Sequence, residues 1–149
     1  MKIYLASDHA GFEYKEAIAQ MLIEMHCEVV DKRAFEEDPS DDYPALVRAA
    51  AEPLSREKES RAIVLGGSGQ GEAMVANRIA GVRAAVYYGG PTDIIKLSRE
   101  HNDANVLSLG ARFLSIDDAK AAVKLWLDTE FSRDERHERR IKDIDNKEV

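Results

Sequence analysis

The sequence predicts a single α/β domain in which helices cover both faces of a parallel sheet. Short apolar segments alternate with stretches whose apolar residues recur every three or four positions, as expected of strands that alternate with amphipathic helices. The central segment, residues 62–72, runs from an apolar stretch into four glycines within six residues and then into helix-compatible residues. The length of 149 residues suits one domain, and no repeat or linker divides the chain.

Five apolar segments are expected to be strands, because each is short, mainly aliphatic and bounded by turn residues. In chain order they are Lys2–Ser7, Glu28–Lys32, a third that starts at about Ala62 and gives way to the glycines from Gly66 on, Arg83–Tyr88 and Asn105–Leu109. Gly89 and Gly90 close the fourth strand, and Gly110 closes the fifth.

The stretches between the strands have the 3.6-residue apolar period of amphipathic helices. Their apolar positions are Ile18, Met21, Leu22 and Met25 after the first strand, Leu46, Val47, Ala50 and Leu54 after the second, Val75 and Ile79 after the third, and Ile116, Ala119, Val123, Trp126 and Leu127 after the fifth. Pro91 opens the helix after the fourth strand, which is expected to run to about Glu100. A final charged helix from about Arg133 carries Ile141 and Ile144 on one side.

Strands that are joined through helices require right-handed crossovers and therefore a parallel sheet. We predict a Rossmann-like three-layer sandwich with a five-stranded parallel sheet, formed by residues 1–149 as one domain, with a C-terminal helical tail from about residue 133. In such sheets, ligands bind at the carboxyl ends of the strands.

Composition excludes several classes of protein. The formal charge of −7 argues against nucleic-acid binding, and no apolar run approaches the length of a membrane span. The single cysteine, Cys27, excludes an internal disulfide and a Cys-rich zinc site, and it suits a reducing cytoplasm. No spacing of His, Asp and Glu suggests a metal site. An acidic loop, Glu36–Asp42, contrasts with a basic cluster near the C-terminus, and a local arginine cluster on an acidic chain favours a small phosphate over a polymer. The cluster consists of Arg133, Arg136, Arg139, Arg140 and Lys142.

The stretch Gly66–Glu72 is the strongest candidate for a ligand-binding segment. A strand, a glycine-rich turn and a helix N-terminus together point backbone N–H groups and a partial positive charge at an anion. The spacing matches neither common nucleotide motif, because no Gly-Lys-Ser/Thr follows and Gly67-x-Gly69-x-Gly71 is not the dinucleotide fingerprint. A connection that only turns tightly is the alternative.

Other polar residues follow the strands and are expected to meet this turn at the carboxyl edge of the sheet. Asp8 and His9 follow the first strand, and Arg112 follows the fifth. Glu72 lies in the first helical turn, where the helix dipole is expected to lower its pKa and keep it ionised as a general base beside an oxyanion-binding loop. Asp8 and Glu72 also have ordinary interpretations as a helix cap and a first-turn carboxylate.

Two further groups are candidates with equally ordinary alternatives. His101, at a helix C-terminus, can contact helix carbonyls or act as a general acid or base near neutral pH. Arg136 and Arg140 are four residues apart and share a helical face, which suits two-pronged phosphate contact as well as a solvated surface. Tyr43 and His26 are assigned structural roles only.

Taken together, seven motifs resemble those of ribose-5-phosphate isomerase type B. The resemblance covers nearly the whole chain, in order and with matching spacing. The motifs are Ser7–Gly11, Asp42–Pro44, Gly67–Gly71, Ala76–Arg78, Gly81–Ala84, His101–Leu107 and Arg136–Arg140.

The resemblance implies that ribose 5-phosphate and ribulose 5-phosphate are interconverted without a cofactor, in a homodimer or a pair of dimers. By this resemblance, His101 donates a proton to open the sugar ring. A base then moves a proton between C1 and C2 through a cis-enediolate that the Gly67–Gly71 amides stabilise, while Ser68 helps to pass the hydroxyl proton between O1 and O2. The implied substrate-binding residues are Asp8, His9, Gly67, Ser68, Gly69, Gln70, Gly71, Asn102, Arg112, Arg136 and Arg140.

The chain departs from many members of that family at the base. Those members carry a cysteine directly before the glycine loop, where this chain has Gly66. Another branch has glycine there and a glutamate just after the loop, and Gly66 with Glu72 matches that branch. The predicted base is therefore the Glu72 carboxylate, which needs no thiol activation.

The expected site residues fall at two opposite edges of the sheet. Asp8, the glycine loop and Glu72 follow strands, whereas His101 and Asn102 end a helix and precede a strand. We therefore expect His101 and Asn102 to reach the pocket of a partner subunit. The same fold also serves isomerases of hexose 6-phosphates such as allose or galactose 6-phosphate, and a non-catalytic sugar-phosphate-binding protein is a third hypothesis.

Overall fold

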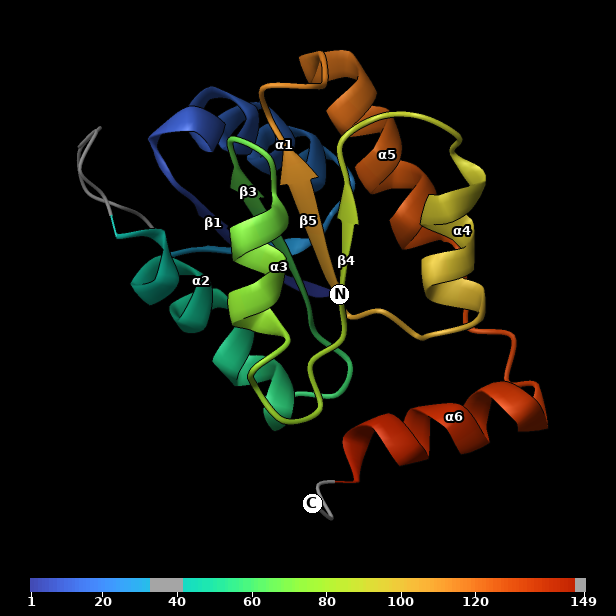
Figure 1. Ribbon diagram of the computed structural model, residues 1–149. Coiled ribbons are helices and arrows are strands. Elements are labelled where there is room, and N and C mark those ends of the chain that lie inside the picture. The colour runs from blue at the N-terminus through green and yellow to red at the C-terminus, as the bar shows by residue number, and fades with distance from the viewer. Residues whose placement is uncertain (33–41, 147–149) are drawn as a thin grey trace.

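The computed structural model, which describes residues 1–32 and 42–146, is an α/β fold built on a five-stranded sheet (Figure 1). Every strand pairing is parallel, and the strand order is β2-β1-β3-β5-β4. The predicted parallel sheet is confirmed, with strand ends within about one residue of those expected. The strands are β1 (Lys2–Ser7), β2 (Glu28–Asp31), β3 (Arg61–Gly66), β4 (Ala84–Tyr87) and β5 (Val106–Gly110).

The helices follow the predicted order, with one clear difference in length. They are α1 (Phe12–Glu24), α2 (Tyr43–Ala51), α3 (Gln70–Ala76), α4 (Asp93–Glu100), α5 (Ile116–Asp128) and α6 (Glu135–Asp145), with 3-10 turns η1 (His9–Gly11) and η2 (Glu52–Ser55). Helix α3 ends at Ala76, before Ile79, and the next residues form turns in which the N–H of Ile79 donates to the Ala76 carbonyl. There the Asn77 side chain bonds the backbone N–H and C=O of Ala84 at 2.7 and 3.1 Å.

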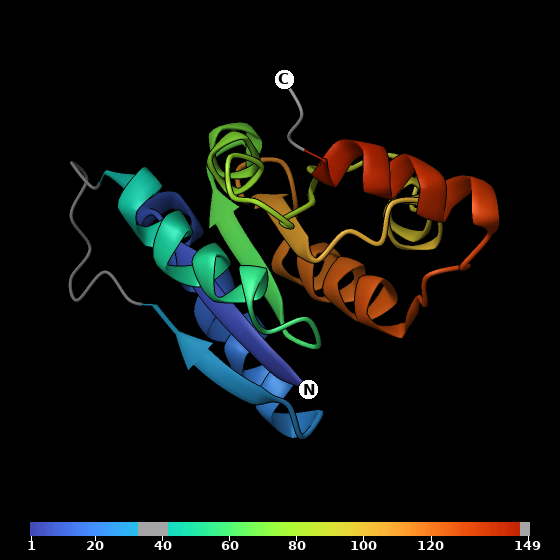
Figure 2. The ribbon, with the colours of Figure 1, turned by 90° about the horizontal axis from the view of Figure 1, so that it is seen from below.

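Alternation along the strands divides the core between the two faces of the sheet. Ile63 and Leu65 belong to the cluster that packs against α1, α4 and α5, whereas Ala62 and Val64 belong to the cluster that packs against α2 and α3. Figure 2 shows the resulting three layers, with α2 and α3 on one side of the sheet and α1 and α5 on the other. Both faces of the sheet are therefore covered, and ligand access is left to its edges.

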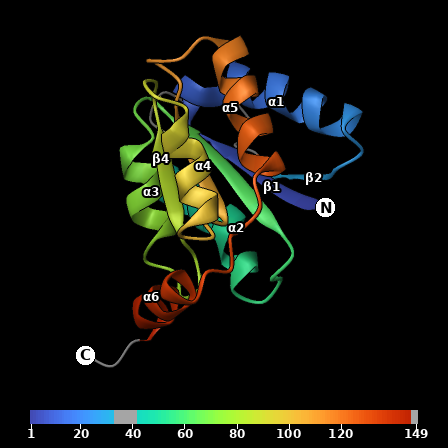
Figure 3. The ribbon, with the colours of Figure 1, turned by 90° about the vertical axis from the view of Figure 1, so that its right-hand side faces the viewer.

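Helix α6 lies beyond the amino-terminal ends of the strands, away from the glycine loop (Figures 1 and 3). Arg83 Nη1 contacts Asp145 Oδ2 at 3.0 Å, and the N–H of Ser132 donates to the carbonyl of Glu100 at 3.1 Å. These contacts fasten the tail to the loops that precede β4 and β5. The acidic stretch 36–41 lies outside the described residues. Within 1–32 and 42–146, no helix has the length and hydropathy needed to cross a bilayer.

Candidate active site

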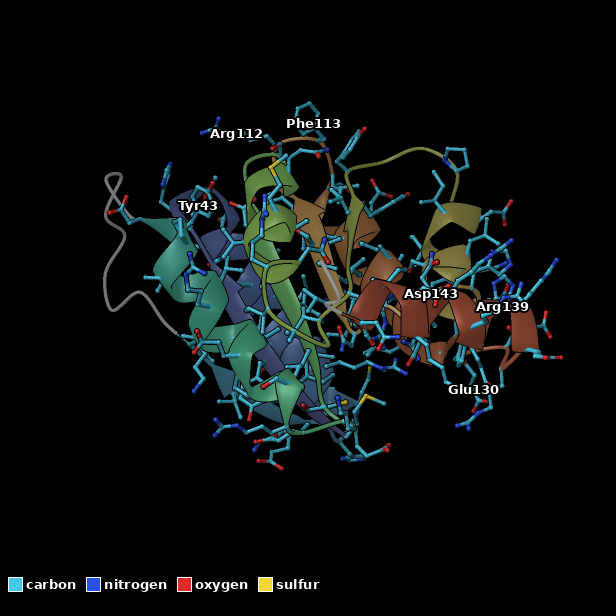
Figure 4. The ribbon with its side chains drawn as sticks, turned by 60° about the horizontal axis from the view of Figure 1, so that its bottom comes forward. Tyr43, Arg112, Phe113, Glu130, Arg139 and Asp143 are labelled. Atoms are coloured by element: carbon cyan, nitrogen blue, oxygen red, sulfur yellow. The ribbon has the colours of Figure 1, made fainter. Side chains whose placement is uncertain are left out.

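A cleft of about 420 Å³ opens at the carboxyl ends of β1, β3 and β5. Six of the predicted site residues line it together with two aromatic residues. Its lining consists of Asp8, Tyr43, Gly67, Ser68, Gly71, Glu72, Arg112 and Phe113. In Figure 4, Tyr43, Arg112 and Phe113 lie at this end of the molecule. The predicted convergence of separate segments at the carboxyl edge is therefore present in the structure.

Strand β5 and the turn that follows it hold the glycine loop in place through hydrogen bonds. Gly69 has φ +75°, a conformation that favours glycine, and the buried Ser108 hydroxyl donates to its carbonyl at 2.6 Å. On the outer side, the N–H of Arg112 donates to the Gly67 carbonyl at 3.1 Å. The exposed Ser68 hydroxyl accepts from the N–H of Gln70 at 3.3 Å. The loop is thus fixed by contacts on both sides.

Glu72 is the buried carboxylate of the cleft, with only 4% of its surface exposed. Burial raises the pKa of Glu72 above 4.5, and the nearby Asp8 acts in the same direction, whereas a hydrogen bond with its own backbone lowers it. The prediction that the helix dipole lowers this pKa is therefore wrong, because desolvation outweighs the helix terminus. A carboxylate with a raised pKa is a stronger base when ionised, as proton abstraction from carbon requires.

At position 66, only a glycine leaves room for the Glu72 carboxylate. A Cβ at position 66 would overlap the Glu72 carboxyl group, and its three nearest atoms all belong to the Glu72 side chain. A cysteine at position 66 and the present position of the Glu72 carboxyl therefore exclude each other. This overlap is a physical reason for the pairing of glycine before the loop with glutamate after it.

Asp8 serves two purposes at the edge of the cleft. Its Oδ1 accepts from the N–H of Gly11 at 3.0 Å, so the ordinary capping role is present at the start of η1. It also lines the cleft and lies close enough to Glu72 to influence its pKa. His9 is exposed next to Asp8, outside the cleft lining.

A second group of predicted residues lies at the opposite edge of the sheet. His101 caps the C-terminus of α4, and its ring stacks on His137 of α6 with centroids 4.3 Å apart. Asn102, Arg136 and Arg140 are exposed. We call His101, Asn102 and α6 the amino-edge unit. Figure 4 shows Arg139 and Asp143 of α6 far from Arg112 and Phe113, so one chain does not bring the amino-edge unit to the cleft.

Comparison with known proteins decides the family. A family model described as Ribose/Galactose Isomerase matches residues 3–144. The chain belongs to this ribose/galactose isomerase family. It is 42% identical to the ribose-5-phosphate isomerase B of Mycolicibacterium paratuberculosis, over 95% of this chain and 87% of that protein. It is 34% identical to the ribose-5-phosphate isomerase B of Escherichia coli K12, over 96% and 93%.

Solved structures agree with the fold and extend the comparison to a ligand complex. The ribose-5-phosphate isomerase B of Mycoplasma genitalium with bound ribulose-5-phosphate superimposes with a TM-score of 0.91 and 33% identity. The match covers 97% of this chain and 93% of that chain. The predicted resemblance to the type B isomerases is therefore confirmed.

Three residues at or beneath the cleft were not among the site residues predicted from the sequence. Tyr43, for which the sequence indicates only a structural role, lines the cleft, and a Cβ on Gly71 would come within 2.8 Å of its Cζ. Phe113 lines the cleft and meets Tyr88 edge to face at 5.9 Å. Ser108 could have been noticed in the sequence, because it is a polar residue within an apolar strand.

Within the described residues, no cluster of three His, Cys, Asp or Glu side chains could hold a metal ion.

Proposed function

We propose that the protein interconverts ribose 5-phosphate and ribulose 5-phosphate in the cytoplasm, without a cofactor. The observation that carries this proposal is the buried Glu72 carboxylate beside the glycine loop, in a cleft at the carboxyl edge of the sheet. The names of the relatives and the ribulose-5-phosphate bound to the Mycoplasma genitalium enzyme support the same substrate. The reaction belongs to the pentose phosphate pathway.

In this mechanism Glu72 removes the proton from C2 of the open-chain aldose and returns it to C1. The intermediate is a cis-enediolate, whose negative charge the backbone amides of the Gly67–Gly71 loop stabilise. Ser68, exposed in the cleft, helps to move the hydroxyl proton between O1 and O2. Asp8, His9 and Arg112 bind the sugar phosphate from the same chain.

The remaining groups are proposed to come from a partner subunit. His101 opens the sugar ring, Asn102 contacts the sugar, and Arg136 and Arg140 bind the phosphate. The separation of the amino-edge unit from the cleft supports this arrangement, since a group that binds substrate has to reach it. Exposed apolar side chains on the β4 side of the sheet support a homodimer, which a pair of dimers would retain. They are Met74, Tyr88, Ile94, Leu97, Phe113 and Ile144.

An isomerase assay on ribose 5-phosphate beside allose 6-phosphate tests the proposal. We expect turnover of the pentose phosphate and a much smaller kcat/KM for the hexose phosphate. Preference for allose 6-phosphate would favour the hexose-phosphate hypothesis. Binding of both sugars without turnover of either would favour a sensor.

A further inference from the structure

The stacked rings of His101 and His137 join the end of α4 to α6 at a proposed catalytic group. The ring planes of His101 and His137 are inclined by only 14°, and the centroids are 4.3 Å apart. His137 is 3% exposed, whereas His101 is half-buried. One face of the His101 ring is therefore covered by an imidazole that substrate cannot reach.

The backbone beneath His101 is fixed independently of this stack. Asp103 has φ +43°, and its carboxylate is held by Arg99 Nη1 at 2.7 Å and Arg83 Nη2 at 3.2 Å. These ion pairs anchor the loop, but they leave the side-chain torsions of His101 undetermined. A half-buried side chain with two free torsions samples several rotamers unless a neighbour selects one.

Burial and neighbouring charges disfavour protonation of His137. The groups that face it are His101 from the end of α4, and Asp134, Arg136 and Arg140 from its own segment. Burial is the main cause that lowers the pKa of His137 below 6.5, and His101 and Arg136 act in the same direction. Asp134, whose Oδ2 lies 3.9 Å from Nε2, acts in the opposite direction. Among the described residues, His137 Nε2 has no hydrogen-bond partner. Near neutral pH, His137 is thus an uncharged ring.

We propose that His137 is a positioning residue for His101, whose flat ring selects the His101 rotamer that reaches the substrate of a partner subunit. This inference rests on the proposed role of His101 in ring opening. In that step the C1–O4 bond of the furanose breaks, the proton of His101 goes to O4, and the proton of the C1 hydroxyl leaves to water as the C1 aldehyde forms. A misplaced acid slows this step, because proton transfer needs hydrogen-bond contact.

The positioning role can be tested by comparing kcat in the two directions of the reaction, because only one of the two substrates forms a ring. Ribose 5-phosphate closes into a five-membered ring through O4, whereas ribulose 5-phosphate cannot close one because its O5 is esterified. His137→Leu, which removes the flat ring, is expected to lower kcat with ribose 5-phosphate about tenfold, a moderate effect for a misplaced catalytic group. The kcat with ribulose 5-phosphate should change less than about twofold, and neither KM should rise, since Arg136 and Arg140 are unchanged. His137→Phe, which keeps a flat uncharged ring, should retain most of the activity with ribose 5-phosphate.

Several results would overturn the inference. Equal losses in both directions, a higher KM, or a Phe variant no better than Leu would mean that His137 only docks α6. If the Leu variant does not fold, His137→Met fills the same buried space with a flexible chain and replaces it. Asp143→Ala, exposed on the same helix, is the control and should leave both directions unchanged.

A measurement without turnover separates this inference from the proposed function. In the wild-type protein, the His137 ring shifts the NMR resonances of the His101 imidazole by its ring current. That shift should persist in the Phe variant and vanish in the Leu variant. An inactive wild type would refute the isomerase function, whereas an active wild type with equal His101 shifts in all variants would refute only the positioning role. His101→Ala sets the reference, and a loss without directional bias there would refute ring opening by His101.

Discussion

The cleft and the amino-edge unit are assembled in different ways. The cleft is built from turns that directly follow strands, so its buried carboxylate and its loop are completed by neighbouring segments of one chain. The amino-edge unit is joined by side chains far apart in sequence, the His101–His137 stack and the Arg83–Asp145 ion pair, and it presents its arginines outward. This difference agrees with the proposal that the cleft holds the reacting carbons of the substrate and that the amino-edge unit serves the cleft of a second subunit.

The largest expected effect is a complete loss of isomerase activity in a hybrid dimer in which one chain has a defective cleft and a defective amino-edge unit. A chain that carries both Glu72→Gln and His101→Ala is paired with a wild-type chain, and the hybrid dimer is purified through two different tags. If each site combines the cleft of one chain with the amino-edge unit of the other, both sites of the hybrid lack one group and activity is lost.

The control for this experiment pairs two wild-type chains that carry the same two tags. A hybrid with half of the control activity would show that one chain supplies both groups. That result would contradict the shared site while leaving the isomerase function intact.

Within the cleft, Glu72→Gln should lower kcat by about 10²-fold or more, the scale of a lost general base. Cys27→Ser is the matched control, because Cys27 lies between α1 and β2 and does not line the cleft. It should leave kcat unchanged, as should treatment with iodoacetamide. Near-normal turnover of the Glu72→Gln enzyme would refute the assignment of the base.

Within the amino-edge unit, Arg136→Ala and Arg140→Ala should mainly raise KM for ribose 5-phosphate. Each lost charge-assisted contact is worth about 1.5–3 kcal/mol, or about 10- to 100-fold in KM. The effect should be larger at low ionic strength, because salt screens the attraction of the wild type. Arg56→Ala, an exposed arginine that belongs neither to the cleft lining nor to the amino-edge unit, is the control. An unchanged KM in both variants would mean that Arg136 and Arg140 do not bind the phosphate and are only solvated surface residues of α6.

A smaller effect is expected from Gly66→Ala, which tests the geometry of the cleft alone. The new Cβ overlaps only the end of the flexible Glu72 side chain, so the fold should persist while the carboxylate is displaced. We expect kcat to fall about tenfold, since small misplacements of a catalytic group are costly. Combined with Glu72→Gln, the substitution should cause little further loss, because both act on one group. Fully additive losses would show that Gly66 has another role.

The sequence predicted those features that depend on neighbouring residues. The strand ends follow from apolar runs and glycines, and β1 is predicted at its observed bounds, Lys2–Ser7. The carboxyl-edge position of the glycine loop follows from the topology of parallel sheets. The opposite position of His101 followed from the same topological argument.

Features that depend on tertiary packing could not be predicted in the same way. The raised pKa of Glu72 arises from burial, which a single helical turn does not reveal. Tyr43 reaches the cleft from the first residue of α2, and His137 meets His101 across 35 intervening residues. The polar Ser108 within an apolar strand was a local signal, but its partner, the Gly69 carbonyl, lies on a different segment.

The smallest expected effect is on stability, and it follows from the sign of the Glu72 pKa shift. Between 4.5 and the raised pKa, the folded protein binds more protons than the unfolded chain, so the free energy of unfolding falls as the pH rises through that window. Above the window the buried carboxylate is ionised, and its desolvation lowers the free energy of unfolding by the full amount.

Glu72→Gln removes this loss of stability, so the inactive variant should be more stable than wild type at pH 7. The sign of the shift predicts a higher Tm for Glu72→Gln than for wild type at pH 7. Thermal unfolding at equal protein concentration measures the difference in Tm, and the gain should vanish well below pH 4.5, where Glu72 is protonated in both states. A gain of equal size at acid and neutral pH would mean that the amide stabilises by packing, and a lower Tm at pH 7 would mean that the ionised carboxylate is stabilised by the loop.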